Sequence, residues 1–171
     1  LERMCVRLLA YCMNSTRGLA FTRGLSTAEE PDLWQHSDSG EIEHWIEVGQ
    51  PEEPRLRKAC GRARQVSVYA FTKNADTWWK LNGGVISALP HLSVWQFDWE
   101  EIVRASTMID RTAQLSVSIA GDTIYQDNSG TSCSVEPKLL TQGDKGQCTG
   151  AVRSPSSTRN NRGRNTRFSA A

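Results

Sequence analysis

The stretch from residue 29 to residue 65 reads EEPDLWQHSDSGEIEHWIEVGQPEEPRLRKACGRARQ and decides how the first half of the chain folds. It starts with a Pro31-Asp32 pair, and residues 41–48 then alternate polar and apolar side chains, which is the period of a β-strand. A proline ends that run, and residues 52–64 carry acids in their first turn and an apolar stripe with helical spacing. The stretch therefore predicts a strand, a tight turn and a helix, preceded by a short strand that begins near Asp32.

Two acids of this stretch meet if its two strands pair as a hairpin. Asp32 lies near the start of the first strand and Glu47 near the end of the second, so antiparallel pairing brings both to one edge of the sheet. Carboxylates held close together repel unless a proton or a cation joins them, and hard oxygen ligands suit Mg²⁺. Bound Mg²⁺ polarises a phosphoryl oxygen and lowers the pKa of an attacking water, so the pair predicts a metal site for phosphate chemistry.

Each of these signals also has a purely structural interpretation. Pro-Asp is a common turn dipeptide, and a glutamate on a half-exposed sheet can simply face solvent, as we expect for Glu43. His44 alternates with aliphatic residues and is expected to be a hydrogen-bonded core residue. Arg55, Lys58 and Arg62 border the apolar stripe of the helix, which is typical of a solvated face as well as of a phosphate-binding surface. The residues alone leave both interpretations open.

An amphipathic helix is predicted before this stretch, at residues 1–14. Glu2 sits at the edge of its apolar arc and is interpreted either as a solvated acid in a fraying turn or as an acid aimed at a site beside the core. Arg3 and Arg7 fall on the side opposite the arc. Because the chain opens in what reads as the middle of a helix, we expect it to be a fragment that lacks its natural start. The arc consists of Met4, Cys5, Leu8, Leu9 and Cys12.

The remaining pattern completes an alternation of strands and helices. Over residues 1–71 the predicted order is helix, strand, strand, strand, helix, strand. Gly83 and Gly84 are expected to interrupt the helix in which they lie. The further predicted elements are strands at 19–22, 65–71 and 92–97, helices at 75–89 and 99–110, and two or three strands between 113 and 135.

The net charge of +1 hides a difference between the two ends of the chain. Residues 143–171 hold six Lys or Arg and one acid, which leaves 14 bases and 18 acids, a net charge of −4, in residues 1–142. We therefore expect one mildly acidic domain at residues 1–142, whose overall charge does not indicate nucleic-acid binding. Residues 143–171 are rich in Ser, Asn, Gly and Arg, and are expected to be a disordered basic tail.

Cysteine usage and hydropathy place the protein in the cytoplasm. The five cysteines have no Cys-x-x-Cys spacing, and Cys5, Cys12 and Cys60 fall on apolar helix faces, so they are expected to be buried free thiols. The sequence shows no signal peptide and no apolar run long enough for a membrane span. We expect neither a membrane partner nor a small-molecule cofactor.

Six blocks of the sequence resemble the YaeQ family of bacterial proteins, from residue 1 to about residue 136. The resemblance implies an α/β (α+β) fold with a restriction-endonuclease-like core, in which a mixed central sheet is flanked by helices in the order αβββαβ. It also implies a modified form of the PD-(D/E)XK motif of that nuclease superfamily. The blocks are MCVRLLAYCMN (4–14), LAFTRGLSTAEEPDLWQ (19–35), GEIEHWIEVGQP (40–51), RLRKACGRARQVSVYAF (55–71), DTWWKLN (76–82) and LPHLSVWQF (89–97).

The resemblance assigns roles to individual residues. Asp32 and Glu47 match the two acids of the motif, and Glu2 falls where such folds often carry an acid on the first helix. The lysine that follows the second acid by two residues is replaced by Gly49. Gln50, swung inward by a bulge, or Lys58, reaching back from the helix, would supply the missing group. The implied site has Asp32, Glu47 and Glu2 as Mg²⁺ ligands, Asp32, Glu47, Gln50 and Lys58 in catalysis, and Arg55 and Arg62 on DNA or RNA.

Three functions follow as alternatives. The first is Mg²⁺-dependent hydrolysis of phosphodiester bonds in nucleic acid. The second, favoured by the missing lysine at residue 49, is binding or regulation by a nuclease-like fold without hydrolysis. The third is an inactive fragment, because members of the family begin with strands before the first helix and the tail after about Val135 does not match them. The sequence identifies no protein partner.

Overall fold

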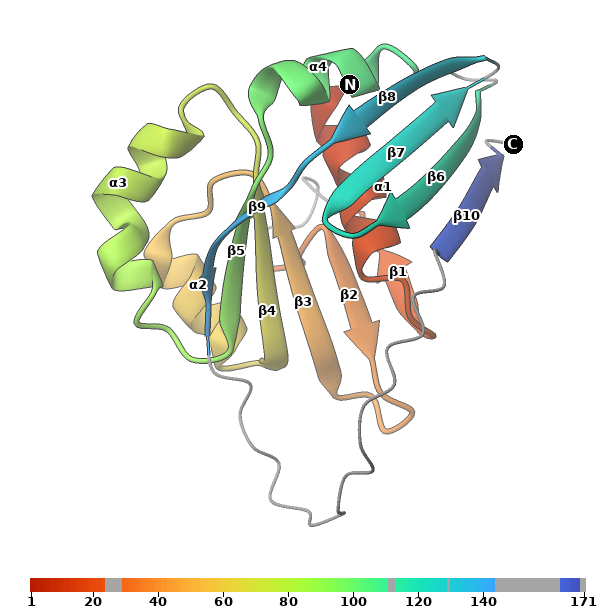
Figure 1. Ribbon diagram of the computed structural model, residues 1–171. Helices are drawn as coiled ribbons and strands as arrows, with labels where there is room; N and C mark the ends of the chain where they lie inside the picture. Colours follow the sequence, from red (N-terminus) through yellow and green to blue (C-terminus); the bar gives the residue numbers. More distant parts are fainter. Residues whose placement is uncertain (24–28, 111–112, 129, 144–163, 170–171) are drawn as a thin grey trace, which may run out of the picture.

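The computed structural model describes residues 1–23, 29–110, 113–128, 130–143 and 164–169 (Figure 1). Helices and strands alternate through the first two thirds of the chain, and strands follow. The elements are α1 (Glu2–Met13), β1 (Leu19–Phe21), β2 (Leu33–His36), β3 (Ile42–Val48), α2 (Glu53–Cys60), β4 (Ala63–Ala70), α3 (Ala75–Ile86), β5 (Leu92–Gln96), α4 (Trp99–Ser106), β6 (Gln114–Ala120), β7 (Thr123–Asn128), β8 (Thr131–Val135), β9 (Lys138–Gln142) and β10 (Arg164–Ser169).

The central sheet is mixed and has the strand order β1-β2-β3-β4-β5-β9. Strands β1 to β3 pair antiparallel, β3, β4 and β5 run parallel, and β9 closes the far edge antiparallel to β5. The predicted fold class and the αβββαβ order of the first elements are both confirmed. The β2–β3 hairpin aligns Leu33 with Ile46, which is the pairing that brings the start of β2 to the end of β3.

Helices cover the central sheet on both faces, and each face has its own apolar core (Figure 1). One core joins α2 and α3 to β3, β4 and β5, with Trp45 and Val68 fully packed within it. The other joins α1 and α4 to the opposite face of the sheet and includes Ile46 and Val48. Neighbouring residues of β3 thus enter opposite cores, as its alternating pattern predicts.

Helix α1 is buried on two sides rather than one. Within the predicted apolar arc Cys5, Leu9 and Cys12 are buried, whereas Met4 is 46% exposed; Ala10, on the opposite side, is fully buried as well. On that side Asn14 donates a hydrogen bond to the hydroxyl of Tyr69 in β4, and Arg7 reaches the backbone oxygens of Thr22 and Asp32. The side of α1 that the sequence assigned to solvent therefore packs on the sheet.

A second, antiparallel sheet has the order β10-β6-β7-β8 and lies beside α1 and α4 (Figure 1). Strands β6 to β8 fulfil the prediction of two or three strands in this segment. Strands β9 and β10 were not predicted, and β10 lies within the segment expected to be disordered, at residues 164–169. Most of that segment, residues 144–163, is outside the described part of the chain, so the domain boundary at residue 142 stays a prediction.

The glycines of α3 and the buried cysteines test two further expectations from the sequence. Helix α3 runs without a break through Gly83 and Gly84, contrary to expectation, because the ring of Trp79 lies against Gly83, where a Cβ would be 2.9 Å from Cε2. The thiols of Cys5, Cys12 and Cys60 are free and buried, as predicted. None of the helices in the described residues is both long and apolar enough to cross a membrane.

Candidate functional site

The two acids predicted to form a metal pair both lie at the edge of the sheet where β3 ends. Asp32 directly precedes β2, and its backbone N–H donates to the carbonyl of Ile46 at 3.0 Å. Glu47 is the penultimate residue of β3. Both side chains are almost completely buried, with 1% of Asp32 and 4% of Glu47 exposed. Buried charges need partners, so the contacts of each carboxylate determine what this edge can do.

Asp32 is surrounded by donors from helix α1 and strand β3. Arg3 Nη2 donates to both carboxylate oxygens at 2.8 Å, and the N–H of Val48 donates to Oδ2 at 2.8 Å. The Nε of Arg7 lies 3.5 Å from Oδ1 and completes a second ion pair. Short hydrogen bonds to ionised groups are the strong ones in proteins, so Asp32 anchors the first turns of α1 to the end of β3.

Glu47 has a different set of partners, on the α2 side of the sheet. Its Oε1 accepts hydrogen bonds from Nε1 of Trp45 and from Nε of Arg55, each at 2.8 Å. Burial raises the pKa of Glu47, and the negative charge of Asp32 acts in the same direction, while these two donors oppose the shift. Asp32 and Glu47 adjoin the paired residues Leu33 and Ile46, at the same end of the hairpin, as the predicted pairing requires.

The position that carries lysine in the plain motif is glycine here, and its backbone explains why. Gly49 has φ +112°, in a region that L side chains rarely adopt. A Cβ at this position would lie 3.4 Å from Nη1 of Arg3. The guanidinium of Arg3 therefore lies beside the backbone at residue 49, and the cation at this edge of the sheet comes from helix α1.

The other predicted site residues lie around this edge without completing a motif. The amide nitrogen of Gln50 is buried and has no hydrogen-bond partner among the described residues. Lys58 pairs with Glu29 rather than with either site carboxylate. Arg62 lies 3.7 Å from the same glutamate and 5.4 Å from the ring centroid of Trp45. The role of Lys58 as a replacement for the motif cation therefore stays a prediction.

The carboxylate of Glu2 pairs with the amino group of Leu1 rather than with either acid of the site. Its carboxylate lies 3.3 Å from the amino group of Leu1. The hydrogen bond of its own backbone N–H is the main cause that lowers the pKa of Glu2, and the neighbouring amino group contributes. No hydrogen bond or ion pair joins it to Asp32 or Glu47 in the described part of the chain, so the metal role predicted for Glu2 stays a prediction.

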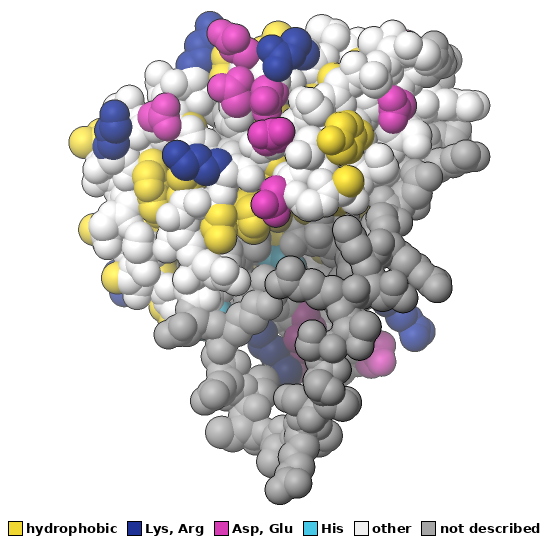
Figure 2. Space-filling model, in the orientation of Figure 1, with side chains coloured by type: hydrophobic (Ala, Val, Ile, Leu, Met, Phe, Trp, Pro, Cys, Tyr) yellow, Lys and Arg dark blue, Asp and Glu magenta, His cyan; other side chains and the backbone are white. Residues whose placement is uncertain are grey.

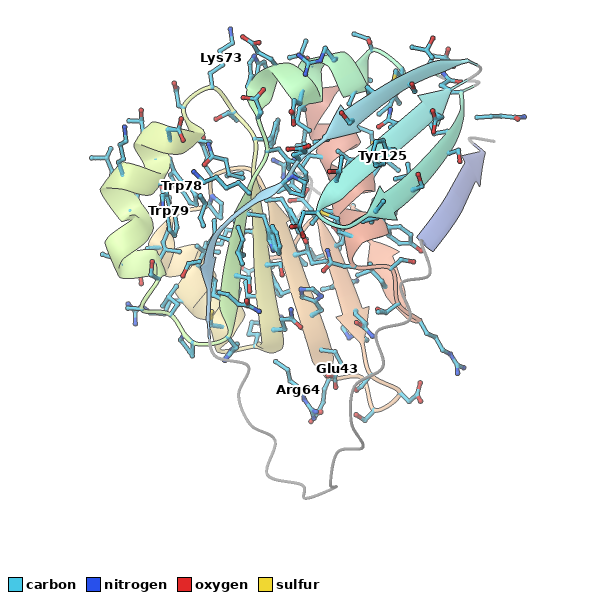
Figure 3. The ribbon with its side chains drawn as sticks, in the orientation of Figure 1. Glu43, Arg64, Lys73, Trp78, Trp79 and Tyr125 are labelled. Atoms are coloured by element: carbon cyan, nitrogen blue, oxygen red, sulfur yellow. The ribbon has the colours of Figure 1, made fainter. Side chains whose placement is uncertain are left out.

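The opposite end of β3 is an ordinary polar surface. There Glu43 and Arg64 point toward one another, with Nε of the arginine 3.5 Å from the carboxylate (Figure 3). An open hollow of about 450 Å³ lies at this end and is lined in part by Glu41, Ile42 and Arg62. On the face shown in Figure 2, acidic and basic side chains lie next to one another and form no continuous basic surface. On this face the basic side chains are therefore only locally grouped, as the sequence composition indicated.

Comparison with known proteins identifies the family to which this arrangement belongs. Residues 1–137 match the family described as YaeQ protein. The chain belongs to the YaeQ family. It is 38% identical over 125 residues to YaeQ of Escherichia coli (strain K12), covering 72% of this chain and 69% of that protein. It is 35% identical over 136 residues to YaeQ of Salmonella typhi, covering 79% and 75% of the two chains.

Solved YaeQ structures have the same fold. The YaeQ crystal structure from Xanthomonas axonopodis pv. citri superposes with a TM-score of 0.79 at 33% identity, covering 82% of this chain and 80% of that one. The crystal structure of YaeQ from Pseudomonas syringae gives a TM-score of 0.78 at 32% identity, covering 85% and 80%. The prediction of a YaeQ-family fold is thus confirmed.

The site of this YaeQ-family chain does not fit Mg²⁺ in its present arrangement. Both oxygens of Asp32 accept short hydrogen bonds from protein donors, so a cation would have to compete with Arg3 and Arg7. Among the described residues, no three side chains of His, Cys, Asp or Glu gather closely enough to hold a metal ion. The arginines occupy the surroundings of Asp32 that a divalent ion would need.

Arg3 and Arg7 are partners of Asp32 that the sequence pattern did not identify. Their spacing of four residues places both side chains on one side of a helix, which is the signal that could have identified them. That side was assigned to solvent because it lies opposite the apolar arc. Only the position of Asp32, at the end of a neighbouring strand, turns the two arginines inward.

Proposed function

We propose that this YaeQ-family protein binds the phosphodiester backbone of nucleic acid with its nuclease-like fold, without hydrolysing it. The observation that carries the proposal is the arginine-filled surroundings of Asp32, with Nη2 of Arg3 at 2.8 Å from each carboxylate oxygen. Carboxylates that act on phosphate through Mg²⁺ need free oxygens, and those of Asp32 are engaged by protein donors. The acids of the motif therefore serve as anchors for cations.

The charge balance of this edge supports binding of an anion. Three arginines, Arg3, Arg7 and Arg55, pair with two carboxylates, Asp32 and Glu47, which leaves one positive charge in excess. Positive charge that neutralises backbone phosphates supplies most of the sequence-independent affinity of proteins for nucleic acid. We propose that the part-exposed guanidinium groups of Arg55, in α2, and Arg62, in the turn after α2, extend this contact along the strand.

The test is a binding and cleavage assay on the same samples. Labelled single-stranded and double-stranded DNA and RNA are incubated with the chain in Mg²⁺ or Mn²⁺, and both anisotropy and product size are followed. We expect salt-sensitive binding and intact nucleic acid. Glu47→Gln keeps a hydrogen-bond acceptor that positions Arg55, so it is expected to leave binding within about threefold. No binding to any of the four nucleic acids would refute the proposal.

Metal-dependent hydrolysis is the second candidate, and one observation favours it. Asp32 and Glu47 adjoin the paired residues Leu33 and Ile46, so both lie at the same end of the β2–β3 hairpin. This function requires a rearrangement that frees Asp32 from Arg3 and Arg7, with Gln50 or Lys58 assisting. Cleavage that depends on Mg²⁺ or Mn²⁺ and disappears in Asp32→Ala would establish it in place of binding alone.

A further inference from the structure

Arg3 has one nitrogen engaged and two that make no hydrogen bond to the described residues. Its Nη2 makes both hydrogen bonds to Asp32, while Nε and Nη1 make none to the described residues. The side chain is 36% exposed, and neither of these nitrogens is among the buried polar atoms that lack a partner, so both reach solvent. A guanidinium held at Nη2 by a buried carboxylate offers Nη1 as a pre-positioned, charged donor.

The backbone beside Arg3 leaves room for this arrangement. Because Gly49 lacks a Cβ, Nη1 of Arg3 comes within 3.4 Å of the point where that atom would stand. The positive φ of Gly49 opposes any other residue at this position. Gly49 therefore stands where the motif has lysine, and its missing side chain allows an arginine from α1 to lie against the end of β3.

The next residue provides a second unengaged donor. Gln50 Nε2 is buried and has no hydrogen-bond partner among the described residues. A buried amide without a partner costs about 1–3 kcal/mol, and such groups in folded proteins usually have a reason to persist. This amide is buried, so the donor that reaches solvent beside this turn is Nη1 of Arg3, in a cluster with an excess of positive charge.

We infer that Arg3 is a phosphate-binding residue, which takes the backbone of nucleic acid through Nη1 while Asp32 holds Nη2. The inference rests on the proposed function and adds the contact that the ligand makes. The ligand is a phosphodiester oxygen, a charged acceptor for the N–H of a held guanidinium. Asp32 acts as the positioning residue for Arg3.

The salt dependence of binding tests this contact. Anisotropy of a labelled single-stranded DNA oligonucleotide is measured over a series of salt concentrations with wild type, Arg3→Met and Arg57→Met. Arg57 is an exposed arginine of α2, paired with Glu53 one turn earlier, and serves as the control. For Arg3→Met we expect at least about tenfold weaker binding and a logarithmic salt slope that is shallower by about 0.7. The control should match wild type in both quantities.

The outcomes separate the two proposals. Wild type that fails to bind overturns the proposed function, and this inference with it. Binding in which Arg3→Met keeps the wild-type affinity and slope overturns the Arg3 contact alone. If Arg3→Met does not unfold cooperatively, Arg3→Lys replaces it, because lysine keeps the pair with Asp32 but has no second nitrogen for the ligand. The same tenfold loss is then expected, and unchanged affinity contradicts the inference.

Discussion

Replacing Asp32 with asparagine should destabilise the fold, and the sign of this change distinguishes an ion-pair anchor from a metal site. In the ion-pair arrangement, Asp32→Asn removes the negative charge that Arg3 and Arg7 share and leaves the N–H of Val48 with a poorer acceptor. In a pair of carboxylates awaiting a cation, removing one charge relieves repulsion and raises stability instead.

The size of the loss follows from the contacts of Asp32. Removing one partner of a buried ion pair costs about 3–5 kcal/mol, because the remaining charge is left unpaired. The side chain of Asp32 is only 2% exposed, but that of Arg3 is 36% exposed and regains water after the change. We therefore expect the lower end, about 3 kcal/mol. For a chain of 171 residues this lowers Tm by about 6–12 °C.

Urea unfolding followed by tryptophan fluorescence measures this difference, with an unchanged m-value as the sign that compactness is preserved. Glu43→Gln is the matched control, because Glu43 lies on β3, which pairs with β2, and faces Arg64 at 3.5 Å in a more exposed pair (Figure 3). The control should change the free energy of unfolding by no more than about 0.5 kcal/mol. An Asp32→Asn protein as stable as wild type, or more stable, would refute the ion-pair interpretation.

Three further predictions follow from buried or strained positions. Burial lowers the pKa of His44 to about 4, so between about pH 6.5 and pH 4 the unfolded chain binds one proton more than the folded chain. On acidification across this range, wild type should therefore lose about 3 kcal/mol more stability than His44→Gln, as measured by urea unfolding at both pH values. Equal losses in the two proteins would contradict this. In thermal melts Gly84→Ala, which enters open space, should stabilise α3 by up to about 1 kcal/mol, whereas Gly83→Ala, which meets a tryptophan ring at 2.9 Å, should destabilise it by about 1–3 kcal/mol. Gly49→Lys should cost at least about 1 kcal/mol in urea unfolding because of its φ of +112°, while Gly61→Ala, with φ −77°, should be near neutral; a stable Gly49→Lys protein would mean that the turn tolerates the motif lysine.

The order of elements could be predicted because each has a clear local pattern. The alternation of β3 and the proline after it predict the strand–turn–helix order. The short turn between β2 and β3 then favours their antiparallel pairing. The convergence of Asp32 and Glu47 is a consequence of that pairing. Strands β9 and β10 could not be predicted in the same way, because their partners β5 and β6 lie far away along the chain.

The partners of the two acids could not be predicted, for a physical reason. Periodicity identifies one apolar side of a helix, but α1 is buried on both sides, and its second side combines Ala10 with Arg7 and Asn14. Polar residues enter a core only where a partner satisfies them, and the partners are on strands that the helix pattern does not specify. Conversely, Lys58 was assigned to the site because its distance to Glu29, a more exposed partner, was not known.

Calorimetric titration of Mg²⁺ into the wild-type chain tests the central claim most directly, namely that arginines rather than a metal ion neutralise Asp32. The claim predicts no saturable heat at millimolar Mg²⁺ and the same flat titration for Asp32→Asn. Saturable binding of one ion per chain that disappears in Asp32→Asn would contradict it, because the carboxylate would then exchange Arg3 and Arg7 for the metal.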